Sequence, residues 1–335
     1  MAKKRVALIL PSEFRRLPAH FGALPAYQEF FPKPDLIVGC SAGAIAGASF
    51  LPWTSDNTAK VAELARNLKA KQIYSRRTVE AFAFLTAATS FVPFFNFNRV
   101  WSGKKKYLMP AAEVATILAL DALFLGQFLK LDSLFSNEPL RKLLTDNLDF
   151  ERIFSSEIKL EMIAADMETS DEVIFTNYLE RDKNPVRFVD GILASSKLAG
   201  KFPSIAPDGR PLGDGAILGN APLHRAIAPH NECDAIILFL YTSVKERRDP
   251  PKTFVGDLIK SAQMTEAALT EARIENFYLR KRLGEKLPEL LIIEAREPLP
   301  DMNMTRFDSE NLIRSMNLGY DAVVSNRNRI EKLLS

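Results

Sequence analysis

The sequence predicts an α/β protein in which helices cover both faces of a mainly parallel sheet. Short apolar runs without polar alternation predict strands that are buried on both faces. Two such runs, Val6–Leu10 and Leu36–Val38, enclose a helical pattern at Phe21–Phe31. This strand–helix–strand opening is typical of a parallel sheet, because parallel neighbours need a crossover connection.

The rest of the chain continues the alternation of strands and helices. No internal repeat, low-complexity tract or linker divides the 335 residues, so we expect a single domain over residues 1–335. We expect C-terminal helices at about 254–334. The later strands are expected at Leu160–Ala164, Glu172–Thr176, Ala235–Tyr241 and Leu290–Glu294, and the later helices at Ala59–Ala70, Phe254–Arg282 and Ser309–Leu334.

Residues 79–131 are rich in Phe, Leu and Ala, and we interpret them as a helical, aromatic-rich insertion. Pro110 and the polar residues after it argue against a membrane-spanning helix, which needs about 20 residues with few or no charges. A helix hairpin in the core is one interpretation. A lipid-facing lid or interfacial patch is the alternative, because the aromatic residues there stand beside Lys104–Lys106, as in helices that lie among lipid headgroups.

Charge and cysteine content narrow the function classes. A net charge of +3 is far below the excess expected of a nucleic-acid-binding protein, so we expect no nucleic-acid partner. Basic clusters such as Lys3–Arg5 suit peripheral contact with an anionic membrane. The two cysteines offer neither a disulfide framework nor metal-ligand spacing, and the first apolar run is too short for a signal peptide. We therefore expect a cytoplasmic protein without a metal site.

The most specific local pattern is Gly-Cys-Ser-Ala-Gly at residues 39–43, a G-x-S-x-G sequence between an apolar strand and small residues at helical spacing. A serine in this strand–turn–helix context is typical of a nucleophile on a strained turn. The flanking glycines suit a sharp turn against a closely packed helix. We predict that Ser41 presents its hydroxyl at a helix N-terminus, where N–H groups and the helix dipole favour developing negative charge.

A second pattern, Gly-Asp-Gly at residues 213–215, places the Asp214 carboxyl on a tight loop. A carboxylate takes a serine proton directly when it lies within hydrogen-bond distance. An ordinary Asp-Gly turn is the alternative interpretation. A Ser–His–Asp triad also stays open, because His224 and His230 follow Asp214 in the chain order of α/β-hydrolases.

Together these patterns resemble the patatin-like phospholipases. That family combines G-x-S-x-G with D-G-[GA]-x-x-x-N-x-P, which residues 214–222 match through Asp214, Asn220 and Pro222. The resemblance covers roughly residues 5–325 in order. Further similar segments are residues 133–144, 163–169 and 194–204 and the position of Gly319.

The resemblance implies a three-layer α/β/α fold with a helical insertion, and a Ser41–Asp214 dyad. Such a dyad cleaves acyl esters of lipids through an acyl-enzyme and uses neither a metal nor a cofactor. The implied substrate is a phospholipid or another lipid ester. We expect the aromatic segment at 79–101 to shape the access of its acyl chain, because such pockets are mostly apolar.

One loop departs from the family pattern. The family's G-G-G-x-R-G loop supplies backbone N–H groups to the oxyanion, whereas residues 12–17 here read Ser-Glu-Phe-Arg-Arg-Leu. The arginine is kept and all the glycines are replaced. Losing one oxyanion donor costs about 10²–10³ in rate, and a glutamate near an oxyanion opposes it. The expected oxyanion and substrate contacts are Ser12, Glu13, Phe14, Arg16 and Ala42.

Three functional hypotheses follow. The leading one is a serine lipid acyl hydrolase of the phospholipase A or lysophospholipase type. The alternative is a catalytically weak or inactive protein that binds lipid or a partner, because the oxyanion loop is degenerate. The third is an acyltransferase, which usually needs a downstream histidine such as His224 or His230.

Overall fold

The structure is a computed structural model that describes residues 3–12, 16–76, 135–197, 202–203, 205, 207–241, 254–300 and 308–335. For residues 76, 254–260, 262 and 263 it describes the backbone alone. The insertion expected at 79–131 lies outside the described residues, as do Glu13 and Phe14. The division into one domain with an insertion therefore stays a prediction.

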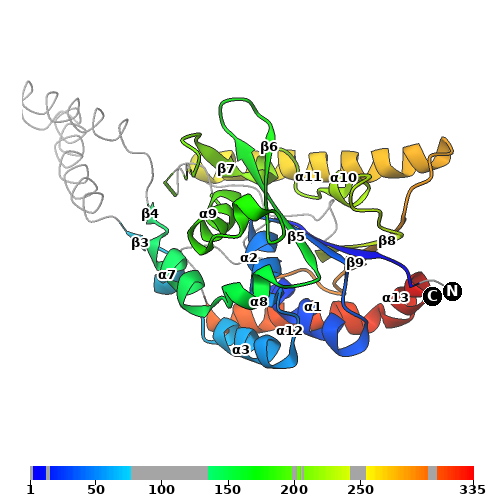
Figure 1. Cartoon of the computed structure of the whole chain (residues 1–335), viewed down its shortest axis with the longest axis horizontal. Helices are drawn as coiled ribbons and strands as arrows, with labels where there is room; N and C mark the ends of the chain where they lie inside the picture. Colours follow the sequence, from blue (N-terminus) through cyan, green and yellow to red (C-terminus); the bar gives the residue numbers. More distant parts are fainter. Residues whose placement is uncertain are drawn as a thin grey trace, which may run out of the picture.

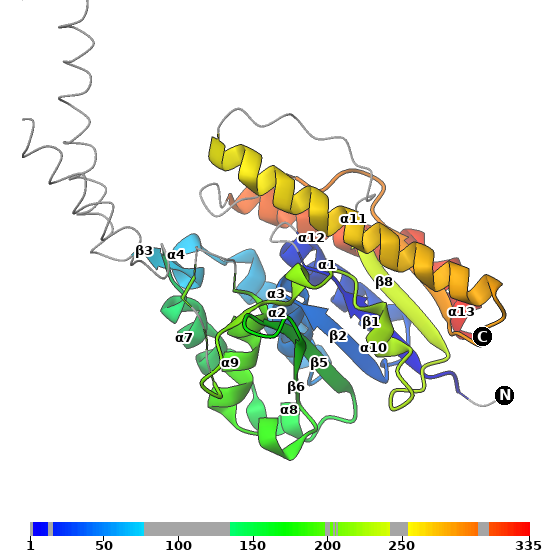
Figure 2. The same ribbon diagram turned by 90° about the horizontal axis from the view of Figure 1, so that it is seen from above.

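A mainly parallel sheet forms the centre of the molecule. Within the described ranges its strands follow the order β6 (Glu172–Thr176), β5 (Lys159–Asp166), β2 (Leu36–Cys40), β1 (Val6–Leu10), β8 (Ala235–Tyr241) and β9 (Glu289–Glu294). Pairing is parallel from β5 to β9, and β6 runs antiparallel to β5. A seventh strand, β7 (Leu212–Asp214), also pairs antiparallel with β5. Figure 2 shows β5, β2, β1 and β8 side by side, with the long helix α11 (Phe254–Arg282) running past them.

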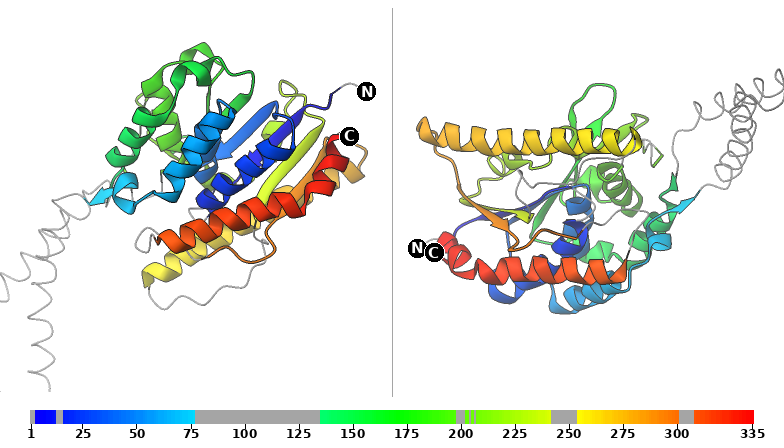
Figure 3. Two further views of the ribbon diagram at one scale, coloured as in Figure 1. Left: turned by 90° about the horizontal axis from the view of Figure 1, so that it is seen from below. Right: turned by 180° about the vertical axis from the view of Figure 1, so that it is seen from behind.

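Helices cover both faces of the sheet, which confirms the predicted α/β fold (Figure 1). One face carries α10 (Leu223–Ala226) and the long α11 (Phe254–Arg282). Seen from below, α12 lies alongside α1 across the other face (Figure 3). The helices that share the hydrophobic core of this second face are α1 (Arg16–Phe30), α2 (Ala42–Phe50), α3 (Ser55–Arg66), α4 (Ala70–Ile73), α7 (Glu138–Asn147), α8 (Phe150–Phe154), α9 (Pro185–Ser195), α12 (Ser309–Ser325) and α13 (Arg327–Leu334).

The alternation of side chains along each central strand divides the interior into two cores. In β1, Leu8 and Leu10 pack with the helices of the α1 face, while Ala7 and Ile9 pack with those of the α11 face. All five residues of β1 are buried. Burial on both sides explains why the strand reads as a continuous apolar run and not as an alternating one.

Several predicted elements have different bounds in the structure. The first helix begins at Arg16 and not at Phe21, because Pro18 stands in its first turn, where the missing N–H has no intrahelical partner anyway. The helix expected at Ala59–Ala70 corresponds to α3, which begins at Ser55 and ends at Arg66, and a separate short helix, α4, begins at Ala70. The expected helix Ser309–Leu334 is interrupted at Asn326.

Several elements of the described chain were not predicted. They include the helices α7, α8, α9 and α10, the strand β7 and a two-stranded sheet of β3 (Ser75–Arg76) and β4 (Phe135–Ser136). Short strands such as β7 lack enough residues to show a periodic pattern.

A separate finding concerns membranes: within the described ranges, no helix combines the length and the apolar character that crossing a bilayer requires.

Candidate active site

Ser41 occupies the sharp turn between the end of β2 at Cys40 and the start of α2 at Ala42. Its backbone has φ 53° and ψ −113°, a conformation that non-glycine residues rarely adopt. Backbone strain of this kind costs about 1–3 kcal/mol and persists only where the surroundings impose it. The turn that the G-x-S-x-G pattern predicted is therefore present, with the serine at the strained position.

The glycines of the pattern are required by close packing. A Cβ on Gly43 would lie 1.8 Å from the carbonyl oxygen of Leu10, and a Cβ on Gly39 would lie 2.6 Å from the carbonyl of Gly43. Neither contact is sterically possible. The N-terminus of α2 consequently sits directly against β1 and β2, which fixes where the Ser41 hydroxyl emerges.

Hydrogen bonds hold both backbone groups of Ser41. Its N–H donates to Ser195 Oγ at 2.9 Å, and the Ser195 hydroxyl in turn donates to the carbonyl of Ile163 at 2.5 Å. Its carbonyl accepts from the N–H groups of Ala44 at 3.0 Å and Ile45 at 3.2 Å. Ser195 lies in α9, in the segment 194–204 that resembled the family, but its contact with Ser41 was not foreseen.

The register of β5 brings Asp214 to Ser41. Along one edge of β5, Ile163 pairs with Cys40 of β2, and the next residue, Ala164, pairs with Asp214 of β7. Strand β7 thus continues the line of β2 from the opposite direction, and Asp214 stands just beyond Cys40. The Ser41 hydroxyl lies close enough to the Asp214 carboxyl to lower its pKa. The structure brings the two predicted residues together.

The Asp214 carboxyl is 3% exposed and has few donors. Its Oδ1 accepts from the Ala216 N–H at 2.9 Å, and the Cys40 thiol lies 4.0 Å away. Its Oδ2 has no hydrogen bond of standard geometry within the described part of the chain. Burial raises the pKa of Asp214 to about 7; hydrogen bonds from Ala216 and Ser41 oppose this rise, and Glu266 adds to it. Near neutral pH this carboxyl both gains and loses a proton readily.

The expected oxyanion residues fall into three groups. The N–H of Ala42, at the start of α2, has no partner among the described residues, as is usual for an N–H group in the first turn of a helix. The N–H of Ser12 donates to Asn220 Oδ1, and the Ser12 carbonyl accepts from Arg16 Nη1 at 3.0 Å. The Ser12 N–H and the Arg16 Nη1 group are therefore both engaged in contacts within the protein. Glu13 and Phe14 lie outside the described residues.

A buried histidine that the sequence reasoning missed supports the same loop. His20 lies in α1 and is fully buried, with Nε2 3.0 Å from the carbonyl of Pro11 and Nδ1 2.9 Å from the Tyr241 hydroxyl. Burial lowers the pKa of His20 to about 3, so the ring is neutral. A carbonyl only accepts, so Nε2–H donates to Pro11 and Nδ1 accepts from Tyr241. No local pattern identifies such a histidine, because its partners come from distant segments.

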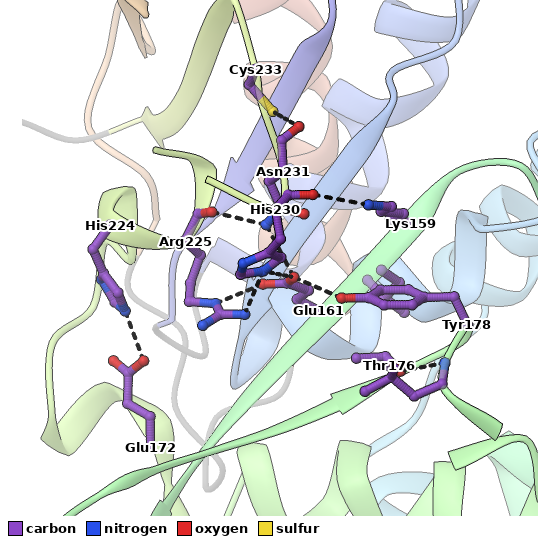
Figure 4. Close-up of polar contacts among 12 residues, drawn as sticks. Lys159, Glu161, Glu172, Thr176, Tyr178, His224, Arg225, His230, Asn231 and Cys233 are labelled. Atoms are coloured by element: carbon purple, nitrogen blue, oxygen red, sulfur yellow. Dashed lines mark hydrogen bonds and ion pairs between the residues drawn. The ribbon is translucent and has the colours of Figure 1, made fainter. Parts of the chain in front are cut away.

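The two histidines considered for a triad belong to other clusters. His224 Nε2 lies 2.7 Å from Glu172 Oε2, and His230 Nε2 lies 3.4 Å from Glu161 Oε1 (Figure 4). Within the described chain, no hydrogen bond joins either histidine to Ser41 or Asp214. The arrangement at Ser41 is therefore a pair of side chains.

Glu161 on β5 is the centre of a second polar cluster (Figure 4). It is 0% exposed and accepts from Arg225 Nε at 2.7 Å, the Tyr178 hydroxyl at 2.9 Å and Asn231 Nδ2 at 3.1 Å. Burial by itself would raise the pKa of Glu161, but these hydrogen bonds and the Arg225 charge outweigh it, and the net pKa is lowered. A carboxylate with this many donors is a stable buried ion pair.

Among the residues that the structure describes, no group of three or more His, Cys, Asp or Glu side chains could hold a metal ion.

Comparison with known proteins identifies a family and also finds similarity to solved structures. Residues 15–227 match the family described as patatin-like phospholipase. The chain is similar to the crystal structure of VipD from Legionella pneumophila, with a TM-score of 0.48 and 12% sequence identity over 96% of this chain. The likeness spans 66% of the VipD chain, a little under two thirds of its length. No curated protein matches this chain in sequence.

Proposed function

This chain belongs to the patatin-like phospholipase family, whose members are lipid acyl hydrolases, and we propose that it hydrolyses lipid acyl esters with a Ser41–Asp214 dyad. The proposed activity is of the phospholipase A or lysophospholipase type. The single observation that supports it most is the pairing of β5 with β2 and then with β7, which puts the Asp214 carboxyl beside the Ser41 hydroxyl.

In the proposed first step, Asp214 takes the proton of the Ser41 hydroxyl while Ser41 Oγ attacks the ester carbonyl carbon. The carbonyl oxygen becomes an oxyanion in a tetrahedral intermediate. When this intermediate collapses, the bond to the leaving alcohol breaks and the alcohol takes the proton from Asp214. The products are the free alcohol and an acyl group bonded to Ser41.

In the second step, a water molecule attacks the acyl carbon and gives its proton to Asp214. Collapse of the second tetrahedral intermediate breaks the bond to Ser41 Oγ, which recovers the proton from Asp214. A base suits this exchange when its pKa lies near the operating pH, and the pKa of Asp214 is raised to about 7 by burial.

The oxyanion in both steps needs preorganised donors. We assign the Ala42 N–H and the N-terminus of α2 to this task, together with the N–H groups of Glu13 and Phe14. Ser12 and Arg16 position the loop that carries them, because the Ser12 N–H is bonded to Asn220 and its carbonyl to Arg16.

We propose that the substrate is a phospholipid or another lipid ester and that the protein acts in the cytoplasm, with peripheral contact to anionic membranes. The basic clusters and the aromatic stretch at 79–131 support this part of the proposal. No metal or cofactor takes part in the proposed reaction.

The altered loop at residues 12–17 favours a second candidate function, namely binding of lipid or of a partner by a catalytically weak or inactive family member. All the glycines of the family loop are replaced, and the N–H of Ser12 is occupied by Asn220. In this case Ser41 and Asp214 would persist without turnover.

A fluorophosphonate probe, which bonds to activated serines, separates the two functions. We expect labelling of the wild-type chain and none of Ser41→Ala. Mass spectrometry of total lipids incubated with each protein should then show free fatty acid released by the wild type alone. Absence of both labelling and fatty-acid release, with and without anionic vesicles, would support the binding function.

A further inference from the structure

An arginine from α11 contacts the loop that follows Asp214. Arg273 Nη2 donates to the carbonyl of Leu218 at 2.6 Å. Its Nη1 lies 3.5 Å from the carbonyl of Gly219 and 3.4 Å from that of Ala221. One guanidinium thus contacts three carbonyl oxygens of a single turn. Arg273 belongs to α11, which follows residue 227, the last residue of the family match.

Gly219 leaves the space that the guanidinium fills. Its φ is +140°, in the region that favours glycine, and a Cβ there would lie 2.3 Å from Arg273 Cζ. No side chain, not even that of alanine, is compatible with Arg273 in this position. The glycine and the arginine are therefore two parts of one contact.

Two further side chains, one on β6 and one on α10, lie near the Arg273 guanidinium. Glu172 Oε1 lies 3.9 Å from Arg273 Nη2, and His224 Nδ1 lies 3.5 Å from Arg273 Nη1. His224 is itself bonded to Glu172 at 2.7 Å, as Figure 4 shows. Glu172 pairs with Ala165 of β5, the neighbour of the residue that pairs with Asp214. The contact around Arg273 and the Ser41–Asp214 pair are consequently built on adjacent positions of one strand.

The turn held by Arg273 also carries Asn220, whose side chain accepts the Ser12 N–H. The N–H groups of Leu218 and Gly219 are bonded inside the turn, to the carbonyls of Gly215 and Ala216. The carbonyls at 218, 219 and 221 face Arg273 instead. A continuous set of contacts thus runs from α11 through the turn to the loop at Ser12.

We propose that Arg273 is a positioning residue that keeps the Asp214 loop and the Ser12 loop in their relative places. The proposal rests on the proposed hydrolase function for its effect on rate, but not for its effect on the loops. Only a guanidinium offers several N–H donors in one plane, so lysine, a point charge on a flexible stem, replaces it incompletely. Displacing catalytic groups by about 1 Å costs about 10²-fold in rate.

The first test measures turnover of a soluble short-chain ester by Arg273→Ala, Arg273→Lys and the control Arg280→Ala. Arg280 lies on the same helix but pairs with the half-exposed Glu285. We expect Arg273→Ala to lower kcat about 10-fold to 100-fold with little change in KM. Arg273→Lys should lose less, and millimolar guanidinium should restore part of the lost rate in Arg273→Ala only. Equal kcat in Arg273→Ala and Arg280→Ala would overturn the proposal.

The second test does not depend on activity. Hydrogen exchange of the Ser12 amide and of the amides of residues 215–221 should be at least about tenfold faster in Arg273→Ala than in the wild type, and unchanged in Arg280→Ala. Gly219→Ala, which cannot coexist with the seated guanidinium, should give the same pattern as Arg273→Ala, and it decides the matter if Arg273→Ala fails to fold.

The two tests separate this proposal from the proposed function. An inactive wild type with faster exchange in Arg273→Ala would reject the hydrolase function and keep the positioning of the loops. An active wild type whose kcat and Ser12 exchange are insensitive to Arg273→Ala and to Gly219→Ala would reject the positioning and keep the hydrolase.

Discussion

Asp214 and Glu161 are both buried carboxyls on strands that pair within one sheet, yet burial affects them differently. Glu161 is 0% exposed and Asp214 is 3% exposed. The pKa of Glu161 is nevertheless lowered, whereas that of Asp214 is raised to about 7. Equal burial therefore does not decide how a carboxyl behaves.

The difference lies in the number and charge of the donors. Arg225, Tyr178 and Asn231 all donate to Glu161, and Arg225 brings a full positive charge. Asp214 has one backbone donor, Ala216, and the hydroxyl of Ser41. A carboxylate satisfied on all sides stabilises the fold as an ion pair, while one left with an open oxygen is suited to accept a proton.

The largest expected effect is on activity. Asp214→Asn should lower kcat/KM for a short-chain ester about 10³-fold to 10⁴-fold, because an amide cannot accept the Ser41 proton. Glu161→Gln is the matched change at the other carboxyl, and it should leave the activity of the folded molecules unchanged. If the two variants lost a comparable share of activity per folded molecule, the assignment of Asp214 as the base and of Glu161 as a purely structural carboxylate would be wrong.

The second prediction concerns the free energy of unfolding. Arg225→Ala leaves the Glu161 charge buried without its main partner, which should cost about 3–5 kcal/mol in urea denaturation at pH 7.5. The lowered pKa of Glu161 means that its contribution is full above the ordinary value of 4.5 and is lost as pH falls. The gap between wild type and variant should therefore shrink at pH 4. A constant gap, or one below about 1 kcal/mol at pH 7.5, would contradict this account.

The third prediction is the pH profile of the Ser41 reaction. The rate of fluorophosphonate labelling should rise roughly tenfold per pH unit below pH 7 and level off above it, because only ionised Asp214 acts as a base. Glu161→Gln should keep the same midpoint. A midpoint near 4, the ordinary value for aspartate, would mean that Asp214 is hydrated in solution and not buried.

The smallest effect is a gain in stability from removing the proposed base. A raised pKa means that the ionised Asp214 destabilises the fold as pH rises from 3.8 through about 7. The full difference corresponds to about 4 kcal/mol at about 1.4 kcal/mol per pH unit, and lost hydrogen bonds offset part of it. The free energy of unfolding of Asp214→Asn should thus be about 1–2 kcal/mol higher than that of the wild type at pH 8, and no higher at pH 4. A less stable variant at pH 8 would show that the Asp214 charge is well solvated.

Local patterns predicted part of the fold correctly. The bounds of β1, β6, β8 and α11 agree with those expected, because runs of apolar residues and helical spacing report directly on burial. The start of α1 was predicted five residues too late; Pro18 stands in the first turn of the helix, a position that tolerates proline. Strand β7 gave no periodic pattern, because a strand of three residues is too short to show one.

In the candidate site, too, some residues could be predicted from the sequence, while the contacts of others could not. Ser41 followed from its own neighbours, and Asp214 from its glycine-flanked loop together with the family resemblance. His20, Asn220 and Arg273 act through contacts with residues far away in the chain, so nothing beside them in the sequence marked these contacts.

The sequence by itself determined the α/β class and the strained turn at Ser41, because burial and the lack of room for a Cβ leave a record in adjacent residues. Only the tertiary structure decided that Asp214 stands beside Ser41 and that Glu161 does not share its chemistry. That decision depends on which residue of β5 pairs with which strand and on which distant donors reach each carboxyl, and neither leaves a periodic trace in the chain.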